Sequence, residues 1–464
     1  MKRKKSTRAK NHTSQKVNTK QTRNFHRFVA FGCVSVFVAV IAVISTIKIL
    51  ERTTSSIKKF NLPELYISLH DAPIEQINMD TKDIKYNNNA VNFVTQNSSA
   101  NFTNVTIKGR GNSTWLLPKK PYQLKFPTKV NLLGNDEKGA KKWILLANYL
   151  DHTHIRNDTA FYIAKLLDKD YPISGTFTEL YIDDNYNGLY YITEKIEIDD
   201  SRVNLSRPGG IIAEIDNLYG TNEDCSYTEL SHTCIVFEDS VLNDLSSEQK
   251  DAFIKSYNLL ESAVAIQDYP TIASIIDIDS FVEYFLLSEF TVNPDAYSSS
   301  FFIYRDGEDD LIHAGPGWDY DYAFGNREWS DPDVDYDSFH SPFNTTILKS
   351  YIDTDIDTRD DSSVHFGNTS TIIYDLLEIP KFAQRVMEIY QQTLSNHQDD
   401  ILDHIRTTAD QIRAAALRDA NRWKFTTNYD NEVDYFIDWV SKRLTHFEET
   451  YGATEANARA KLDF

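Results

Sequence analysis

Apolar and polar residues alternate with a two-residue period in the first half of the chain's body. Alternating or short continuous apolar stretches of this kind predict strands. We expect them at Leu65–Leu69, Asn104–Arg110, Tyr122–Phe126, Trp143–Ala147, Glu179–Asp183 and Gly188–Ile198. The segment Asn87–Asn104 is rich in Asn, Ser and Thr and predicts a loop or a weak hairpin. One segment, Asp151–Leu167, has its apolar residues at helical spacing.

After Asp200 the spacing of apolar residues becomes mostly helical. The predicted helices are Ser246–Ala265, Ser280–Phe290, Thr371–Glu378, Phe382–Ala416 and Glu432–Tyr451. Pro380 is expected to separate the third helix from the fourth. Only Pro294–Phe324 has strand and loop character here. The pattern predicts an α+β protein, with a β-rich region over 61–199 and a helical region over 200–464.

The N-terminus has a different pattern. Met1–Arg27 holds ten Lys or Arg residues and no acidic residue, and Phe28–Ile47 is uncharged and apolar. About 20 residues of helix span the hydrocarbon core of a membrane. We therefore predict a basic cytoplasmic tail over 1–27, a transmembrane anchor over 28–50, a linker over 51–60 and an extracytoplasmic body. A cleaved signal peptide is the alternative, but the long basic region and the lack of a clear cleavage site argue against it.

Charge limits the possible partners of the body. The chain has 48 basic and 68 acidic residues, so removing the ten basic residues of the tail leaves 38 against 68, a net charge near −30. Such a body repels nucleic acid, which excludes DNA and RNA binding. Cys33 lies in the apolar segment, whereas Cys225 and Cys234 lie in the body. In an oxidising compartment these two could form a disulfide; the alternative is two free thiols.

Acidic residues lie at both ends of a predicted hairpin within Asn293–Asn326. Asp295 precedes it, and Asp319 and Asp321 follow it two residues apart, so that they face one side of an extended segment. Carboxylate oxygens are the ligands that Mg²⁺ prefers. The alternative is a solvated turn, which the neighbouring glycines, proline and tryptophan disfavour. Asp331–Asp337 lacks the EF-hand pattern and is expected to be a solvated acidic loop.

The segment Lys108–Phe126 combines glycines with hydrogen-bond donors. Its two leading glycines permit close backbone approach to a phosphate, and Arg110 and Asn112 offer donors. Lys125 lies in the predicted strand and could reach from the sheet to a phosphate; the alternative is a surface lysine. The segment does not match a Walker A loop.

Four stretches together resemble the spore-coat CotH family of atypical protein kinases. They are IKGRGNSTW with KKPYQLKF (Ile107–Phe126), WILLANYLDHTHIRND (Trp143–Asp158), ELYIDDNYNGLYYITEKIEID (Glu179–Asp199) and NPDAYSSSFFIYRD with AGPGWDYDYAFGN (Asn293–Asn326). They occur in the order found in the family and extend over about half the chain. The resemblance implies a protein-kinase-like two-lobe fold, with a β-rich N-lobe, a helical C-lobe and an ATP cleft between them.

The resemblance also implies roles for the acidic residues. Asp295 resembles the catalytic-loop aspartate, which orients the acceptor hydroxyl and accepts its proton. Asp319 resembles the magnesium-binding aspartate of a D-F-G motif, and Asp321 is expected to assist it. Ser300 departs from the pattern of ordinary kinases, which have at this place an Asn that holds a second magnesium ion.

Basic residues acquire roles by the same resemblance. Lys125 resembles the strand lysine that contacts the α- and β-phosphates, with Arg110 and Asn112 near the phosphates and Lys195 near the hinge. The segment Asp151–Leu167 has no Glu to pair with Lys125.

The implied activity is transfer of the γ-phosphate of ATP, with Mg²⁺ or Mn²⁺, to Ser/Thr hydroxyls of extracytoplasmic or surface proteins. Two alternatives stay open: a catalytically inactive kinase-like surface adhesin or coat-assembly protein, and a kinase-like enzyme that transfers AMP.

Overall fold

The chain divides into two units, Met1–Asn61 and Leu62–Phe464, and all described residues belong to the second. The computed structural model describes residues 62–133, 139–205, 207, 209–217, 224–238, 245–326, 335–337 and 372–452. The predicted tail, anchor and linker, Cys33 and most of the acidic loop Asp331–Asp337 lie outside these residues. No helix within the described ranges has both the length and the apolar character needed to cross a membrane.

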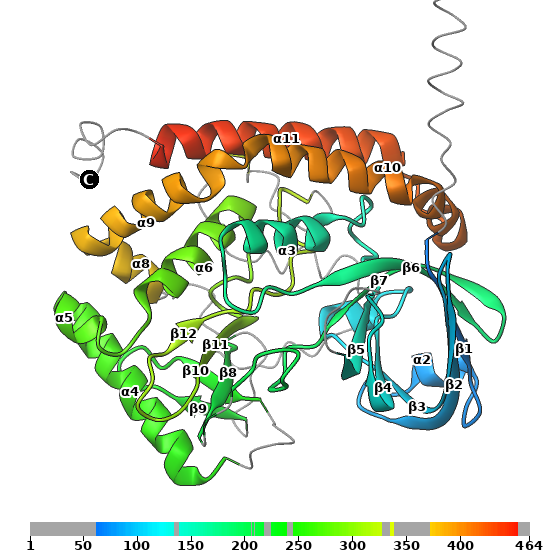
Figure 1. Ribbon diagram of the computed structural model, residues 1–464, viewed down its shortest axis with the longest axis horizontal. Coiled ribbons are helices and arrows are strands. Elements are labelled where there is room, and N and C mark those ends of the chain that lie inside the picture. Colours follow the sequence, from blue (N-terminus) through cyan, green and yellow to red (C-terminus); the bar gives the residue numbers. More distant parts are fainter. Residues whose placement is uncertain are drawn as a thin grey trace, which may run out of the picture. The chain divides into compact units, whose positions relative to one another are not determined.

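Seven strands close into a barrel in the order β1-β2-β3-β4-β5-β7-β6 (Figure 1). Their bounds are β1 Glu64–Ser68, β2 Tyr86–Val94, β3 Ser99–Gly109, β4 Tyr122–Val130, β5 Ala140–Leu146, β6 Gly175–Ile182 and β7 Asn185–Glu194. Neighbours pair antiparallel except β1 and β6, whose parallel pairing closes the barrel. The alternating residues Tyr122, Leu124 and Phe126 of β4 point into the apolar interior of the barrel.

A second sheet of five strands lies in the part of the chain that was predicted to be helical. Its order is β12-β11-β8-β10-β9. The bounds are β8 Ile211–Ile215, β9 Cys225–Tyr227, β10 Cys234–Phe237, β11 Phe301–Arg305 and β12 His313–Ala314. The predicted hairpin within Pro294–Phe324 is confirmed, because β11 pairs antiparallel with β12. A disulfide joins Cys225 to Cys234 and so links β9 to β10.

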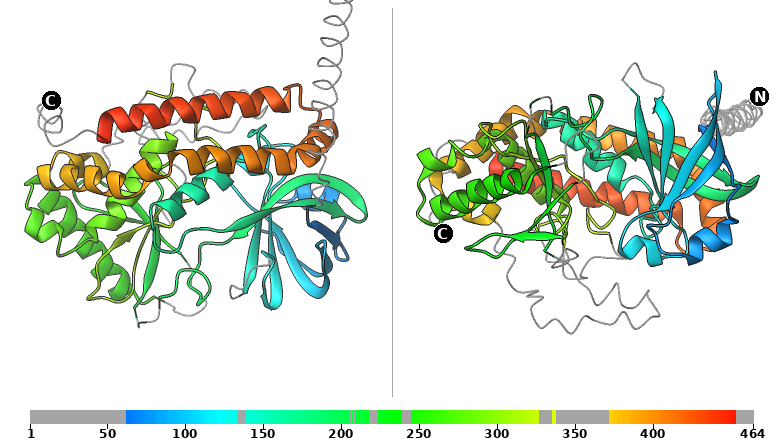
Figure 2. Two further views of the ribbon diagram at one scale, coloured as in Figure 1. Left: turned by 45° about the horizontal axis from the view of Figure 1, so that its top comes forward. Right: turned by 90° about the horizontal axis from the view of Figure 1, so that it is seen from below.

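Helices cover both sheets. Their bounds are α2 Ile74–Met79, η1 Ser113–Leu116, α3 Arg156–Leu166, α4 Ser247–Ala265, α5 Tyr269–Ile272, α6 Ile278–Thr291, α8 Ile372–Leu377, α9 Pro380–Gln392, η2 Leu394–Asn396, α10 Gln398–Trp423 and α11 Tyr429–Tyr451. α10 and α11 lie side by side over α3 and α6 (Figures 1 and 2). The predicted break at Pro380 is confirmed, since this residue begins α9.

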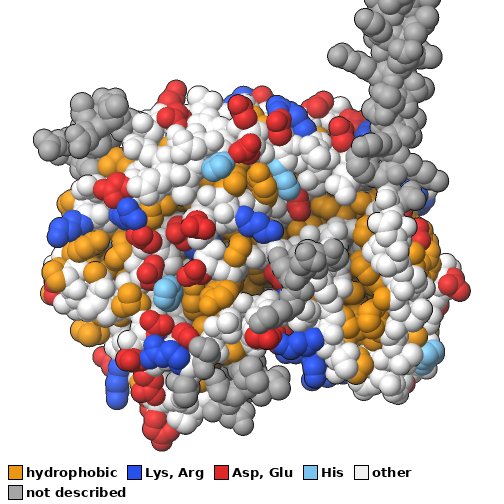
Figure 3. Space-filling model, in the orientation of Figure 1, with side chains coloured by type: hydrophobic (Ala, Val, Ile, Leu, Met, Phe, Trp, Pro, Cys, Tyr) orange, Lys and Arg blue, Asp and Glu red, His pale blue; other side chains and the backbone are white. Residues whose placement is uncertain are grey.

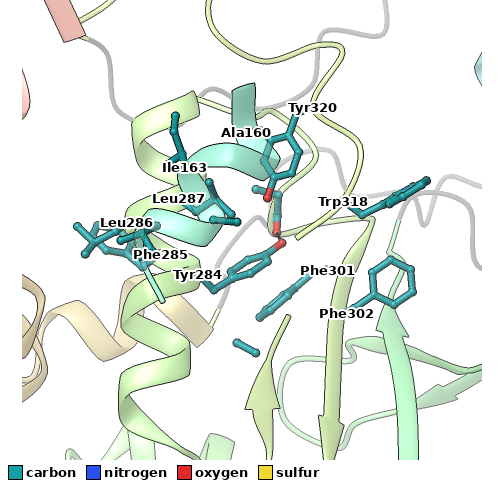
Figure 4. Packing of buried hydrophobic residues seen from close by; sticks show 14 of the residues in the cluster. Ala160, Ile163, Tyr284, Phe285, Leu286, Leu287, Phe301, Phe302, Trp318 and Tyr320 are labelled. Atoms are coloured by element: carbon teal, nitrogen blue, oxygen red, sulfur yellow. Dashed lines mark hydrogen bonds between the residues drawn. The ribbon is translucent and has the colours of Figure 1, made fainter. Parts of the chain in front are cut away.

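The largest core lies where α3 and α6 pack against the second sheet. In Figure 4, Tyr284 and Leu287 of α6 point toward the start of β11 and the segment after β12, and Ala160 and Ile163 of α3 lie close by. Phe285 and Leu286 point to the other side of α6. Trp318 and Tyr320 of that segment are buried in the same cluster. The segment that carries Asp319 is therefore held by a packed core on one side.

The prediction of a two-lobe kinase-like fold with a β-rich N-lobe and a helical C-lobe is wrong. The first half forms a closed seven-stranded barrel, and the second half contains a sheet of its own before its C-terminal helices. Barrel closure rests on the parallel β1–β6 pairing, which no residue pattern reveals. The strands β9 and β10 are three and four residues long, too short for a period to be read.

Candidate active site

A cavity of about 340 Å³ is lined by residues of the barrel, the second sheet and the loops between them. Its volume is within the range of sites that take small molecules. Asp295, Asp319 and Asp321 all line it. The structure thus brings together the three carboxylates that the hairpin was expected to bring together.

The amide side chain of Asn293 joins the two acidic segments, and that of Asn326 bonds within the second. Asn293 accepts a hydrogen bond from the backbone N–H of Asp295 at 3.2 Å and donates one to the carbonyl of Asp319 at 3.1 Å. Asn326 donates to the carbonyl of Asp321 at 2.7 Å. Asp319 adopts a left-handed backbone conformation with φ of +66°. Such a conformation is unfavourable for a residue with a Cβ, so the surrounding contacts must maintain it.

The end of strand β8 supports the turn that follows Asp295. Oε1 of Glu214 accepts a hydrogen bond from the backbone N–H of Ser300 at 3.0 Å, and Asp216 accepts one from the hydroxyl of Ser299 at 3.0 Å. Glu214 also lines the cavity. These residues were not predicted from the sequence, although Glu214 and Asp216 alternate at the end of an apolar run, IIAEID.

The carboxyl groups of the cavity have strongly perturbed acidities. Burial, reinforced by the charges of Asp319 and Asp216, raises the pKa of Asp295 well above its usual range. Burial and the charge of Asp319 do the same to the pKa of Asp321. Burial raises the pKa of Glu214 to about 8. For Asp319, burial raises the pKa and the nearby guanidinium of Arg110 opposes the rise. The cavity therefore disfavours the charged forms of these carboxyl groups, and a cation bound among them would favour those forms.

Basic side chains from the barrel line the other side of the cavity. Arg110 follows β3 and stacks on Trp318, with the guanidinium carbon 5.0 Å from the ring centre. The ammonium nitrogen of Lys108, at the end of β3, lies 3.7 Å from Oδ1 of Asp83. Lys195, just after β7, donates a hydrogen bond to Glu238 at 3.2 Å. The predicted residues Arg110 and Lys195 thus line the cavity, together with Lys108, which was not predicted from the sequence.

The sequence of the chain identifies its family. The family model described as CotH kinase protein matches residues 107–447, which is more than half of the chain. The chain belongs to the CotH kinase family. No curated protein matches it. Membership in the CotH kinase family indicates a kinase-related function and, in general terms, the use of ATP and a divalent cation.

Lys125 does not reach the cavity of this CotH kinase family member. Its side chain is exposed on β4 and is absent from the cavity lining. Along the same face of β4, Gln123 lines the cavity and pairs in register with Lys108 of β3. Asn112 lines the cavity too, is exposed, and accepts a hydrogen bond from the ammonium group of Lys82.

The carboxylate side of the cavity fits a hard divalent cation. Oδ1 of Asp295 and Oδ1 of Asp321 are buried and have no hydrogen-bond partner among the described residues. Within that part of the chain, no three His, Cys, Asp or Glu residues are arranged to hold a metal ion by themselves. Mg²⁺ at phosphate-transfer sites usually takes one or two carboxylates and completes its shell with water and phosphate. The residues present suit that mode of binding.

Proposed function

We propose that the chain is a protein kinase that transfers the γ-phosphate of ATP to Ser/Thr hydroxyls of proteins outside the cytoplasm. One observation carries the proposal: buried carboxyl oxygens of Asp295 and Asp321, without hydrogen-bond partners among the described residues, face basic side chains across a cavity of small-molecule size. Membership in the CotH kinase family supports it at the level of a kinase-related function.

The cavity residues have complementary roles in this proposal. Asp295 orients the acceptor hydroxyl and accepts its proton while the hydroxyl oxygen bonds to the γ-phosphorus. The bond between that phosphorus and the bridging oxygen breaks, and ADP leaves. Asp319 and Asp321 would hold Mg²⁺ or Mn²⁺, which offsets negative charge on the phosphates.

The phosphates themselves would be bound from the barrel side. Arg110, Lys108 and Lys195 supply positive charge there, and the backbone around Gly111 permits close approach. Lys125 has no part in this proposal, because its side chain does not line the cavity.

We also propose that Phe28–Ile47 anchors the chain in a membrane with the body outside. The Cys225–Cys234 disulfide supports this location, since disulfides persist in oxidising compartments. The face drawn in Figure 3 shows Asp and Glu interspersed with Lys and Arg.

The test uses the full chain purified in mild detergent with Mg²⁺ and a pool of Ser/Thr-containing peptides. We expect label to transfer from γ-labelled ATP, and Asp295→Asn and Asp319→Asn to reduce the rate at least about a hundredfold. Asp183→Asn, in an exposed turn, is the matched control and should be fully active.

Three other outcomes would reject the proposal. Equal transfer by the wild type and Asp319→Asn, or none by either, would favour the adhesin or coat-assembly alternative. Transfer of label from the α-phosphate would instead indicate an enzyme that transfers AMP.

A further inference from the structure

Two segments that lie far apart in the sequence touch at the cavity. One is the loop Gly109–Leu117, called the barrel loop here, and the other is Trp318–Tyr322, called the acidic turn. The hydroxyl oxygens of Ser113 and Tyr322 lie 2.6 Å apart, close enough for one to donate a hydrogen bond to the other. Both residues line the cavity.

The ring of Tyr322 fixes where its hydroxyl lies. Tyr322 is buried and packs with Leu117 and Leu150 in a small apolar cluster that is separate from the two large cores. Leu117 ends the barrel loop, so this loop and the acidic turn share an apolar contact as well as the hydrogen bond. A tyrosine held in this way has little freedom to move its hydroxyl.

A second contact joins the same two segments on the other side of the acidic residues. The guanidinium of Arg110, in the barrel loop, stacks on Trp318, which begins the acidic turn. The barrel loop thus contacts the acidic turn at both ends of the turn, at Trp318 and at Tyr322. Asp319 and Asp321 lie between these two contacts. Gly111 lies between Arg110 and Ser113 with φ of +79°, a conformation in which a side chain would be strained. Glycine gives the barrel loop conformational freedom at this position, and the contacts of Arg110 and Ser113 with the acidic turn limit that freedom.

We propose that Ser113 and Tyr322 form a latch that positions the barrel loop against the acidic turn. The latch rests on the proposed function. It makes phosphate binding by the barrel loop and cation binding by the acidic turn interdependent. The reason is that the latch holds each segment in the position in which it binds its own ligand next to the other's. Ser113 and Tyr322 are positioning residues in this scheme, and neither takes part in proton or phosphoryl transfer.

The latch is tested by a double-mutant cycle on nucleotide binding. The probe is the non-hydrolysable ATP analogue adenylyl imidodiphosphate with Mn²⁺, titrated calorimetrically into the full chain in detergent. Tyr322→Phe and Ser113→Ala should each weaken binding of the analogue about fivefold, as expected for loss of one hydrogen bond. The double variant should bind no more weakly than either single variant, and Ser113→Thr should restore most of the affinity.

The matched control is Tyr435→Phe. Tyr435 also donates its hydroxyl, to the carbonyl of Gly325 at 2.9 Å, but it does not line the cavity. This variant should bind the analogue like the wild type. Tyr322→Phe keeps the buried ring, and an unchanged unfolding temperature would show that loss of affinity does not come from misfolding.

A second measurement does not depend on nucleotide. Amide hydrogen exchange in residues 111–117 should be faster in Tyr322→Phe and Ser113→Ala than in the wild type or Tyr435→Phe. Unchanged exchange, or single effects on analogue binding that add up in the double variant, would overturn the latch alone. A wild type that does not bind the analogue would reject the proposed function and the coupling with it.

Discussion

Lys108 and Lys125 lie on adjacent strands of the barrel, but only Lys108 lines the cavity. In the β3–β4 pairing, Lys108 is opposite Gln123, whereas Lys125 is opposite Thr106, two positions further from the cavity. Alternation along a strand fixes which face a side chain occupies, but not how far along the strand a ligand reaches. For this reason the strand pattern alone could not distinguish between the two lysines.

Exchange of each lysine for methionine tests this difference. Lys108→Met should raise the KM for ATP about tenfold or more, because an ammonium group that meets a phosphate contributes a charge-assisted hydrogen bond. Lys125→Met, which removes the same charge from an exposed position, should leave the KM for ATP within about twofold of the wild type. Steady-state assays of label transfer over a range of ATP concentrations give both values. The reverse ranking would return the phosphate-binding role to Lys125.

The acidic residues show how far the sequence could define the site. Asp295, Asp319 and Asp321 lie in one continuous segment whose hairpin can be read locally, so that their convergence on one cavity was predictable. Glu214 and Glu238 reach the same cavity from β8 and from the end of β10. They were missed because the second sheet itself was not predicted.

Local polar contacts determine where several helices begin and end. The spacing of apolar residues carries no information about these contacts, so the boundaries could not be predicted from it. The helix expected over Asp151–Leu167 begins only at Arg156, because the carboxylate of Asp151 accepts hydrogen bonds from the backbone N–H groups of Thr153 and Arg156 and holds the chain in a turn. The helix expected over Phe382–Ala416 is interrupted near Thr393, whose φ of −119° and ψ of −95° are not helical. Asn87–Asn104, expected as a loop or weak hairpin, is a hairpin, because it lies in the consecutive antiparallel strands β2 and β3 and the short connection between them.

A buried ion pair lies where α6 begins beneath β12. The ammonium group of Lys169 donates to the carbonyls of Ser280 and Ala314, each at 3.1 Å, and lies 3.8 Å from Glu283. Burial lowers the pKa of Lys169 to about 8 and raises the pKa of Glu283 to about 7. Both shifts disfavour the charged forms. The pair therefore holds Ala314, which precedes the acidic turn, at a cost in stability near neutral pH.

The Glu283→Gln exchange should change the pH dependence of unfolding. Because the folded pKa of Glu283 lies above the unfolded value of 4.5, the folded state binds the extra proton, so its contribution is fully present below pH 4.5 and is lost as pH rises through about 7. The free energy of unfolding of the wild type should therefore fall relative to the variant between pH 5 and pH 8, by roughly 2–3 kcal/mol. Urea denaturation at the two pH values measures this difference. Glu75→Gln, at an exposed site on α2, should follow the wild type, and parallel profiles for Glu283→Gln and the wild type would contradict the expectation.

At the scale of the whole described unit, helix α10 joins the barrel to the helical layer (Figure 1). Arg418 forms a bidentate pair with Glu179 of β6, at 2.9 and 2.6 Å. One residue later, Asp419 lies 2.9 Å from the ammonium group of Lys119 and accepts a hydrogen bond from the backbone N–H of Leu189 at 2.8 Å. The Lys119–Asp419 pair is fully buried, whereas the Arg418 side chain is 54% exposed. Lys119 also lines the cavity, so the same pair joins α10 to the wall of the site.

These two neighbouring ion pairs should differ sharply in what they contribute to stability. Asp419→Asn leaves the buried ammonium of Lys119 without a counter-charge and should lower the free energy of unfolding by about 3–5 kcal/mol. Glu179→Gln removes the buried carboxylate of the other pair and leaves the half-exposed guanidinium of Arg418, which water can solvate, so it should cost no more than about 1 kcal/mol. The double variant Lys119→Met with Asp419→Leu replaces both charges by apolar groups and should recover most of the loss, since neither side is then left unpaired in the interior. Urea denaturation of the four proteins decides between this account and one based on packing. If the double variant were as unstable as Asp419→Asn, the shape of the junction, and not its buried charge, would be what joins α10 to the barrel.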